Sequence, residues 1–389
     1  MPLLCRLLTV LLLLSAAGCG SSGSSDDAGD SANPDLTTTT LSGTTDSEGH
    51  VTFEFTIGES VAGAQLVVFP PEGRVRLTAL IDPAGSDLAR GLTQNITDAV
   101  ATRAAPSSLG LPLPGQTLRA GTWQARYQVV ESRGNDLLPN REVTLQLITK
   151  RDGDLSAGNV RVNLIFVGPT ADSDDTRDAL EDATDFASII LDQVRLRLDV
   201  EEYEISGPDI LPDPRDGDPL YDDISNAVRP NAVNILVGVD VDGLQNDGLD
   251  YSIPGGIPGA AVPSPRSGSP MSVLEMTDDG RFNDDGSGSS EEHNDEVRLA
   301  GEEMAQLIGH WLGLAHNVDL RGNRVIAADS LADTESCITE EDCQDEADVR
   351  ENFMFPYPLE IEGTGDEYYV RGRVTDDQAE AMHRSVLVD

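Results

Sequence analysis

Two histidines in the last third of the chain have the types and spacing of metal ligands. His310, Gly313 and His316 follow one another at intervals of three residues, at the end of a segment in which apolar residues recur every three or four positions. That recurrence predicts a helix over 295–314. Glycine at position 313 can end the helix in a backbone conformation that other residues avoid, so that His316 approaches from another direction. Neutral imidazoles are common zinc ligands, so the two histidines are candidate metal ligands.

The segment that carries these histidines resembles a zinc-peptidase signature, and the positions that would complete the site in that signature carry other residue types here. Gln306 lies four residues before His310 and so on the same helical face, but an amide carbonyl is a poor zinc ligand beside histidine. Leu307 follows it and cannot accept a proton, and loss of a general base alone typically costs ~100- to 10,000-fold in rate. Glu302 and Glu303 lie one turn earlier. No catalytic residue is intact, and two readings stay open: the histidines bind zinc, or they are inherited structural residues.

The segment 306–316 resembles the zinc signature H-E-x-x-H-x-x-G-x-x-H of the metzincin peptidases. The resemblance implies that His310 is the second metal ligand, Gly313 the turn and His316 the third ligand. Gln306 then stands at the first ligand position and Leu307 at the position of the catalytic glutamate, which polarises a zinc-bound water in that family.

Further stretches support the same resemblance. Asn352-Phe-Met-Phe-Pro356 resembles the Met-turn, which would place Met354 beneath the metal site. Residues 329–343 resemble a disulfide loop of some secreted bacterial members, and Thr375 begins a capping box that opens a final helix. The resemblance covers 157–389. It implies an α/β (α+β) metzincin-like domain with a mixed sheet, an active-site helix, a Met-turn and a C-terminal helix.

The order of elements before the motif is that of an α/β domain. Apolar runs predict buried strands at 160–167 and 231–239, and a short edge strand at 272–276. Between the first two, a helix is predicted over 175–198, with one apolar face made of Ala179, Ala183, Phe186, Ile190 and Val194. The polar stretch 281–294 is expected to be mobile.

Residues 38–152 predict an all-β sandwich. Several short apolar runs, some strictly alternating as in Val51, Phe53, Phe55 and Ile57, are separated by clusters of Gly, Pro, Asn and Asp. The phrase around Trp123 resembles the late strand of pre-peptidase modules of secreted bacterial peptidases. No catalytic cluster occurs in this stretch, which favours a structural or binding module.

The N-terminus predicts export and a lipid anchor. Arg6 precedes an apolar run that is too short to span a bilayer, and small residues lead to Cys19. This resembles a bacterial lipobox, which implies a signal peptide over 1–18 and acyl chains on Cys19. Residues 19–37, rich in Gly, Ser and Asp, predict a flexible tether. Gly20 after the cysteine implies, by the same resemblance, the outer membrane of a bacterial cell envelope.

The net charge and the cysteine count bear on which ligands the protein can bind and on whether it contains a disulfide. With 26 basic and 69 acidic residues the net charge is -43, which excludes nucleic acid, because its phosphates would be repelled. Calcium stays undecided: Asp240, Asp242, Asp247 and Asp250 form an acidic loop, but Leu244 breaks an EF-hand pattern. Once Cys5 leaves with the signal peptide and Cys19 is lipidated, Cys337 and Cys343 remain as a close pair, which predicts a disulfide in an exported protein.

The sequence favours a membrane-anchored peptidase homologue that binds peptides or proteins without cleaving them. Gln306 and Leu307 replace the first metal ligand and the catalytic glutamate, whereas the other motifs that resemble the metzincin peptidases are present. An atypical active zinc metalloendopeptidase, with Gln306 or Glu303 completing the site, is one alternative. A surface protein that binds its partner through the β-sandwich is the other.

Overall fold

The computed structural model of the 389-residue chain describes residues 35–69, 73–90, 107–113, 115–131, 136–151, 153, 155–211, 227, 229, 232–241, 269–272, 290–320, 324–329, 331–356, 359 and 369–389. Residues Pro34–Asp389 form one compact unit. Of the helices within the described ranges, none is both long and apolar enough to cross a membrane. The predicted signal peptide, Cys19 and most of the predicted tether lie outside these ranges.

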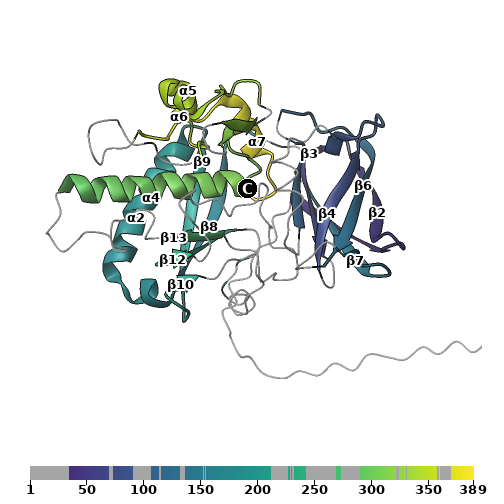
Figure 1. Ribbon diagram of the computed structural model, residues 1–389, viewed down its shortest axis with the longest axis horizontal. Coiled ribbons are helices and arrows are strands. Elements are labelled where there is room, and N and C mark those ends of the chain that lie inside the picture. The colour runs from purple at the N-terminus through teal and green to yellow at the C-terminus, as the bar shows by residue number, and fades with distance from the viewer. Residues whose placement is uncertain are drawn as a thin grey trace, which may run out of the picture. The chain divides into compact units, whose positions relative to one another are not determined.

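The N-terminal region is a β-sandwich of two antiparallel sheets, as the sequence predicts. One sheet has the order β1-β7-β3-β5 and the other the order β2-β6-β4. Figure 1 labels strands of both sheets. In β2 the apolar residues are buried and the residues between them are exposed, so that one face of the strand fills the core. The elements are β1 (Leu36–Thr44), β2 (His50–Ile57), β3 (Val61–Phe69), β4 (Arg74–Ile81), the 3-10 helix η1 (Leu88–Arg90), β5 (Ser107–Leu111), β6 (Gly121–Val130) and β7 (Glu142–Arg151).

The second region is built on a parallel sheet of the order β13-β11-β8-β9. Its strands are β8 (Gly158–Val167), β9 (Leu196–Ile205), β11 (Val233–Gly238) and β13 (Ser269–Ser272). Both faces of β11 are buried, as expected of a central parallel strand. The sequence predicted a mixed sheet, but each described pair of neighbours in this sheet is parallel. A further short parallel pair joins β10 (Ile210–Leu211) to β12 (Asp240–Val241).

Two helices cover one face of this sheet (Figure 1). The 3-10 helix η2 (Gly168–Asp172) leads from β8 into α2 (Asp174–Asp192), which packs along α4 (Ser290–Trp311). Side chains of α2, α4, β8 and β11 form one hydrophobic core, and a separate cluster covers the opposite face of the sheet. The core fixes α4, and with it the end of α4 that carries His310.

Several predicted boundaries are wrong. The helix predicted over 175–198 ends at Asp192, because Arg195 has a positive φ of 59° and β9 begins one residue later. The strand predicted at 272–276 lies at Ser269–Ser272. β1 begins inside the stretch predicted to be a tether. α4 begins at Ser290, within the stretch expected to be mobile.

The buried face of α2 is wider than the predicted one. Ala179, Ala183 and Ile190 are buried as predicted, and Leu180, Ala187 and Leu191 are buried as well. Phe186, placed on the apolar face by its spacing, is 36% exposed. The reason is close packing of α4: a Cβ added to Gly301 would lie 2.5 Å from the Cβ of Phe186. Small residues along α2 let the helices approach, and the aromatic ring is turned outward.

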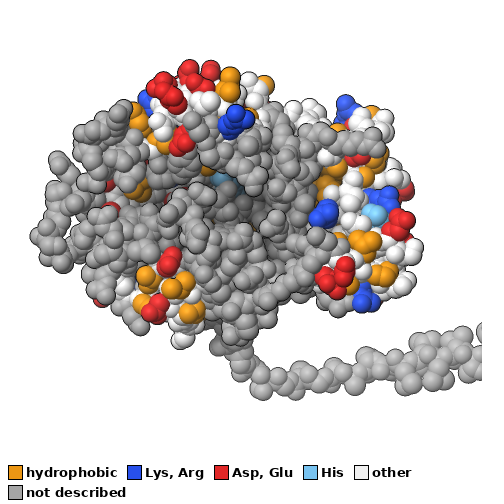
Figure 2. All heavy atoms as spheres, viewed as in Figure 1, with side chains coloured by type: hydrophobic (Ala, Val, Ile, Leu, Met, Phe, Trp, Pro, Cys, Tyr) orange, Lys and Arg blue, Asp and Glu red, His pale blue; other side chains and the backbone are white. Residues whose placement is uncertain are grey.

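The C-terminal part consists of short helices and strands, and it contains the predicted disulfide and the predicted capping box. Cys337 and Cys343 form a disulfide, which confirms that prediction. At the last helix, Thr375 and Gln378 exchange side-chain-to-backbone hydrogen bonds in the predicted capping box. Acidic side chains gather over α5 and α6 (Figure 2). The elements are β14 (Val318–Leu320), β15 (Val325–Ala328), α5 (Glu340–Asp345), α6 (Ala347–Arg350) and α7 (Asp376–His383).

Candidate functional site

The structure brings the two predicted histidines together at the end of α4. Gly313 has a φ of 107°, a backbone conformation that favours glycine, and the helix ends two residues before it. The amide of Leu314 donates to the carbonyl of Gly309 over 3.0 Å, which closes the turn. His316 then lies beside His310, with ring centroids 4.8 Å apart and an angle of 68° between the rings. Both side chains are buried.

The environment of His310 keeps its ring neutral. Burial, together with the neighbouring His316, lowers the pKa of His310 from 6.5 to about 3, against the opposing effect of its hydrogen bond to Leu314. Nδ1 lies 2.9 Å from the Leu314 carbonyl oxygen, which can only accept, so Nδ1 carries the proton. The Nε2 lone pair of a neutral ring is the one that binds metals, and a carbonyl partner on Nδ1 is the usual means of orienting such a ligand.

Met354 packs directly against the helix that carries His310. A Cβ at Gly309 would lie 2.6 Å from Sδ of Met354 and 2.9 Å from the Phe353 ring. The carbonyl of Met354 accepts a hydrogen bond of 3.1 Å from the amide of Asn317, next to His316. Met354 is fully buried. Met354 thus packs against α4 one residue before His310, and Gly309, which no sequence pattern singled out, makes room for it.

Gln306, at the first ligand position, is bound to a buried cation. Its Oε1 accepts a hydrogen bond of 3.0 Å from Nη1 of Arg371, and the same nitrogen donates to the carbonyl of Phe355 over 3.0 Å. The Arg371 side chain is 1% exposed. The Gln306 amide is therefore already engaged by the guanidinium of Arg371, which lies 65 residues later in the chain.

Glu302 balances that guanidinium. Its Oε2 lies 3.3 Å from Nε of Arg371, and its Oε1 lies 2.6 Å from Nη1 of Arg298. Glu302 is 1% exposed, so its charge is removed from water and compensated by the two arginines. The sequence placed Glu302 near the motif but gave it no role. Here it joins Arg298, Arg371 and Gln306 in one buried network, which we call the Arg371 network.

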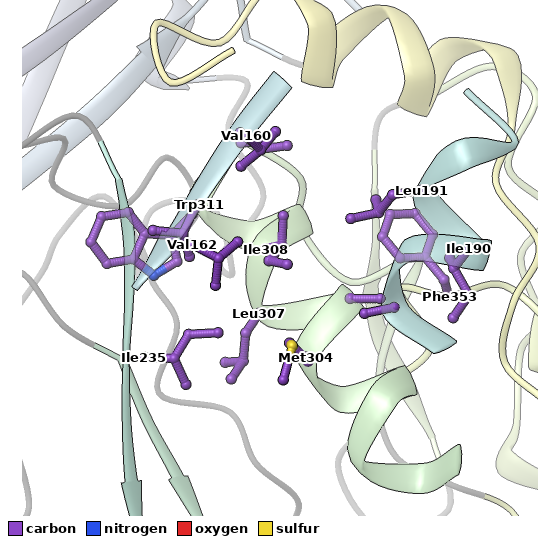
Figure 3. Packing of buried hydrophobic residues seen from close by; sticks show 14 of the residues in the cluster. Val160, Val162, Ile190, Leu191, Ile235, Met304, Leu307, Ile308, Trp311 and Phe353 are labelled. Atoms are coloured by element: carbon purple, nitrogen blue, oxygen red, sulfur yellow. The ribbon is translucent and has the colours of Figure 1, made fainter. Parts of the chain in front are cut away.

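Leu307, at the position of the general base, faces the hydrophobic core. It is buried with Met304 of its own helix and Ile235 of β11, and lies between them in Figure 3. Glu303, the other side chain considered as a ligand, is 1% exposed. Within the described ranges, no three His, Cys, Asp or Glu side chains gather closely enough to hold a metal ion. Of the acidic loop considered for calcium, Asp242, Asp247 and Asp250 lie outside those ranges.

The donor set does not fit a usual zinc site. Structural zinc sites present four protein ligands, and catalytic sites three with water. Two imidazoles are present, and Gln306, the side chain at the first ligand position, is an amide whose oxygen already accepts from a guanidinium. A dication placed there would also have to approach the buried charge of Arg371.

A half-buried carboxyl lies shortly after the histidines. The amide of Asp329 donates to the carbonyl of Asn317, and Asp329 Oδ1 accepts from the Leu331 amide over 3.2 Å. Burial, with a smaller contribution from the carboxylates of Asp333 and Asp377, raises the pKa of Asp329 from 3.8 to about 7 against the opposing effect of its hydrogen bonds. Negative charge is therefore concentrated between this loop and the start of α7.

Replacing Asp329 with asparagine is expected to stabilise the protein at pH 8 by on the order of 1–4 kcal/mol, and at pH 5 by about a third of that. A carboxyl whose pKa is higher in the folded chain stabilises the fold fully below its unfolded pKa of 3.8, and that contribution is lost progressively as the pH rises from there through about 7. Urea unfolding at both pH values measures the effect. The exposed Asp345 provides a control: Asp345→Asn should change neither value. Equal pH dependence in wild type and Asp329→Asn would contradict the assignment.

No protein-family model and no curated protein matches the sequence. Among solved structures, the protein YXIM of Bacillus subtilis is 12% identical over 48% of this chain and 45% of its own, with a TM-score of 0.15. A family two carbohydrate esterase from Cellvibrio japonicus is 12% identical over 54% of this chain and 81% of its own, with a TM-score of 0.13. The alignment thus spans less than half of the first protein, and neither likeness carries an argument about fold or function.

Proposed function

We propose that this protein is a catalytically inactive metzincin-like peptidase homologue that binds a peptide or protein without cleaving it. The observation that carries the proposal is the engagement of Gln306, at the first ligand position, by the buried guanidinium of Arg371. Leu307 supports it, because an alkyl side chain in the core offers no proton acceptor at the position of the general base.

The motifs that resemble those of the metzincin peptidases support the proposal that this protein is a homologue of them. The His310–Gly313–His316 turn, the methionine packed beneath it and the capped final helix occur in the order that the resemblance implies. Such a frame can persist after catalysis is lost, because the helix, turn and Met354 are held by packing and hydrogen bonds between protein groups. A stable surface that has lost its catalytic groups can still bind a peptide or protein.

We also propose that the chain is anchored in a bacterial cell envelope through acyl chains on Cys19, in the outer membrane. The support is in the sequence alone: an apolar run with a preceding Arg6, small residues before the cysteine, and a polar stretch after it. The partner would then be a peptide or protein of the envelope or its surroundings, and the net charge of -43 excludes nucleic acid.

One observation favours the atypical active zinc peptidase as a second candidate. His310 is neutral, oriented through Nδ1 and next to His316, which is the state that a metal ligand needs. Under this reading, Glu303 or water would complete the coordination and another carboxylate would serve as base.

The zinc content of the purified full-length protein, dialysed against trace zinc, separates the two candidates. We expect a value near zero per chain, no change in melting temperature on adding a chelator, and no cleavage of a peptide library. His310→Ala should then have the same zinc content as wild type. A value near one per chain that His310→Ala abolishes, together with peptide cleavage that a chelator blocks, would favour the active peptidase.

A further inference from the structure

A cavity of about 210 Å³ lies between the sandwich and the turn that carries the histidines. Gln65 of β3 and Gly110 of β5 line one side. Gly313 of the turn lines another, and α7 contributes Asp377 and Glu380. His310 and His316 are not among the residues that line it, so the cavity is separate from the candidate metal site.

The walls of this cavity are held in fixed positions. Where β3 meets the end of the chain, contact is so close that a Cβ on Gly63 would overlap the carbonyl of Arg384. Beside that contact, the ammonium of Lys150 on β7 donates to the carbonyls of His383 and Val388, over 2.8 Å each. Val386 packs against β3 and β7 in a small apolar cluster. A ligand would therefore meet a preformed site and would not have to order one.

Gly110 keeps the cavity open. A Cβ added at this position would meet only the Gln65 amide oxygen, at 3.5 Å, which is an ordinary contact. Glycine is therefore not required by the backbone at position 110, whose φ is not in the left-handed region. What its missing side chain provides is space on the outward face of β5.

The α7 side of the cavity is acidic. Asp377 accepts from the Ala332 amide and its own amide donates to Asp333, which places two carboxylates next to each other, near the half-buried Asp329. In the part of the chain that the structure describes, no lysine or arginine forms an ion pair with any of these three. Arg384 also lines the cavity, but it is paired with Glu380, which leaves Asp377 as the lining carboxylate without an ion pair to another described residue. The uncompensated charge favours a cation.

We propose that this cavity binds a lysine or arginine side chain of a partner peptide, with its charged end on Asp377. A volume of about 210 Å³ is below the roughly 300 Å³ of the smallest sites for drug-sized ligands, and so suits one side chain. Carboxylates give charge-assisted hydrogen bonds to ammonium and guanidinium groups. The inference rests on the proposed function for the ligand being a peptide, and it names where the peptide binds and which residue it carries.

Binding of three fluorescein-labelled pentapeptides to the purified full-length protein tests the proposal by fluorescence anisotropy. The peptides are Gly-Gly-Lys-Gly-Gly, its arginine counterpart and its norleucine counterpart, with blocked C-termini. We expect the two cationic peptides to bind at least about tenfold more tightly than the norleucine peptide, because only they form a charge-assisted hydrogen bond. Asp377→Asn should remove most of that difference, and it retains an oxygen for the Ala332 amide.

Gly110→Val fills the cavity and should abolish binding of the cationic peptides. Gly58→Val is its matched control, since Gly58 is exposed, lies outside the cavity lining and also tolerates a Cβ. Equal binding of all three peptides, unaffected by Gly110→Val, would overturn the cavity assignment while leaving peptide binding elsewhere intact. Absence of binding by every peptide would overturn it as well. Cleavage of the peptides would instead count against the proposed function.

Discussion

Replacing Arg371 with methionine is expected to lower the free energy of unfolding by about 3–5 kcal/mol, the usual cost of breaking a buried ion pair by removing one partner. The loss leaves Glu302 buried with Arg298 as its one remaining ion-pair partner among the described residues, and it deprives Gln306 Oε1 and the Phe355 carbonyl of their donor. Urea unfolding followed by circular dichroism measures the change.

A matched control lies two residues further along the chain. The Arg373 side chain is 46% exposed and pairs with Asp348, whose side chain is 52% exposed. Arg373→Met should therefore cost no more than about 1 kcal/mol. The double variant Arg371→Met/Glu302→Gln should be more stable than Arg371→Met alone, because it removes the buried charge that the single substitution leaves behind. Equal effects of Arg371→Met and Arg373→Met would show that the Arg371 network contributes nothing.

The Arg371 network joins the helix that carries His310 to the segment around Met354. A metal bound by residues of α4 and of the following turn would join these segments through its coordination bonds. Here a guanidinium joins α4, through Glu302 and Gln306, to the carbonyl of Phe355 beside Met354. The link is made of protein groups alone, so its integrity does not depend on metal supply.

The sequence predicted those parts of the site that depend on local spacing. His310 and His316 were found because a helical period, followed by a glycine, determines where side chains point over a few residues. The structure confirms the turn at Gly313 and the meeting of the two rings. Strands β2 and β8 were found for the same reason, since alternating or continuous apolar runs indicate how many faces are buried.

The remaining parts depend on contacts between distant segments. Arg371 lies 65 residues after Gln306, and no local pattern around it differs from that of an exposed arginine. In the sequence Gly309 resembles any glycine inside a helix. In the structure Met354 occupies the space that a side chain at this position would need. Phe186 fits the apolar period of α2, but the close approach of α4 at Gly301 turns it outward. Periodicity along one segment carries no information about which partner packs against it.

Gln306→Asn and Gln306→His together test whether the histidine pair still has the geometry of metal ligands. Gln306→His is expected to raise the zinc content after dialysis from near zero to about one per chain, because three imidazoles and a water make a common zinc set. Position 306 lies one helical turn before His310 on the same face of α4. Arg371 keeps Glu302 and the Phe355 carbonyl as partners after the substitution, so the Arg371 network loses one acceptor only.

Gln306→Asn is the control, since it shortens the amide without adding a ligand, and it should bind no zinc. Adding His310→Ala to Gln306→His should return the zinc content to near zero. We expect no peptidase activity from the zinc-loaded variant, because Leu307 remains in the core where no proton acceptor is available. If Gln306→His bound no zinc, the charge of Arg371 or the ring orientations would exclude metal even from a full set of ligands. If it bound zinc and cleaved peptides, the general base would have to be a carboxylate elsewhere in the chain, because position 307 is a leucine.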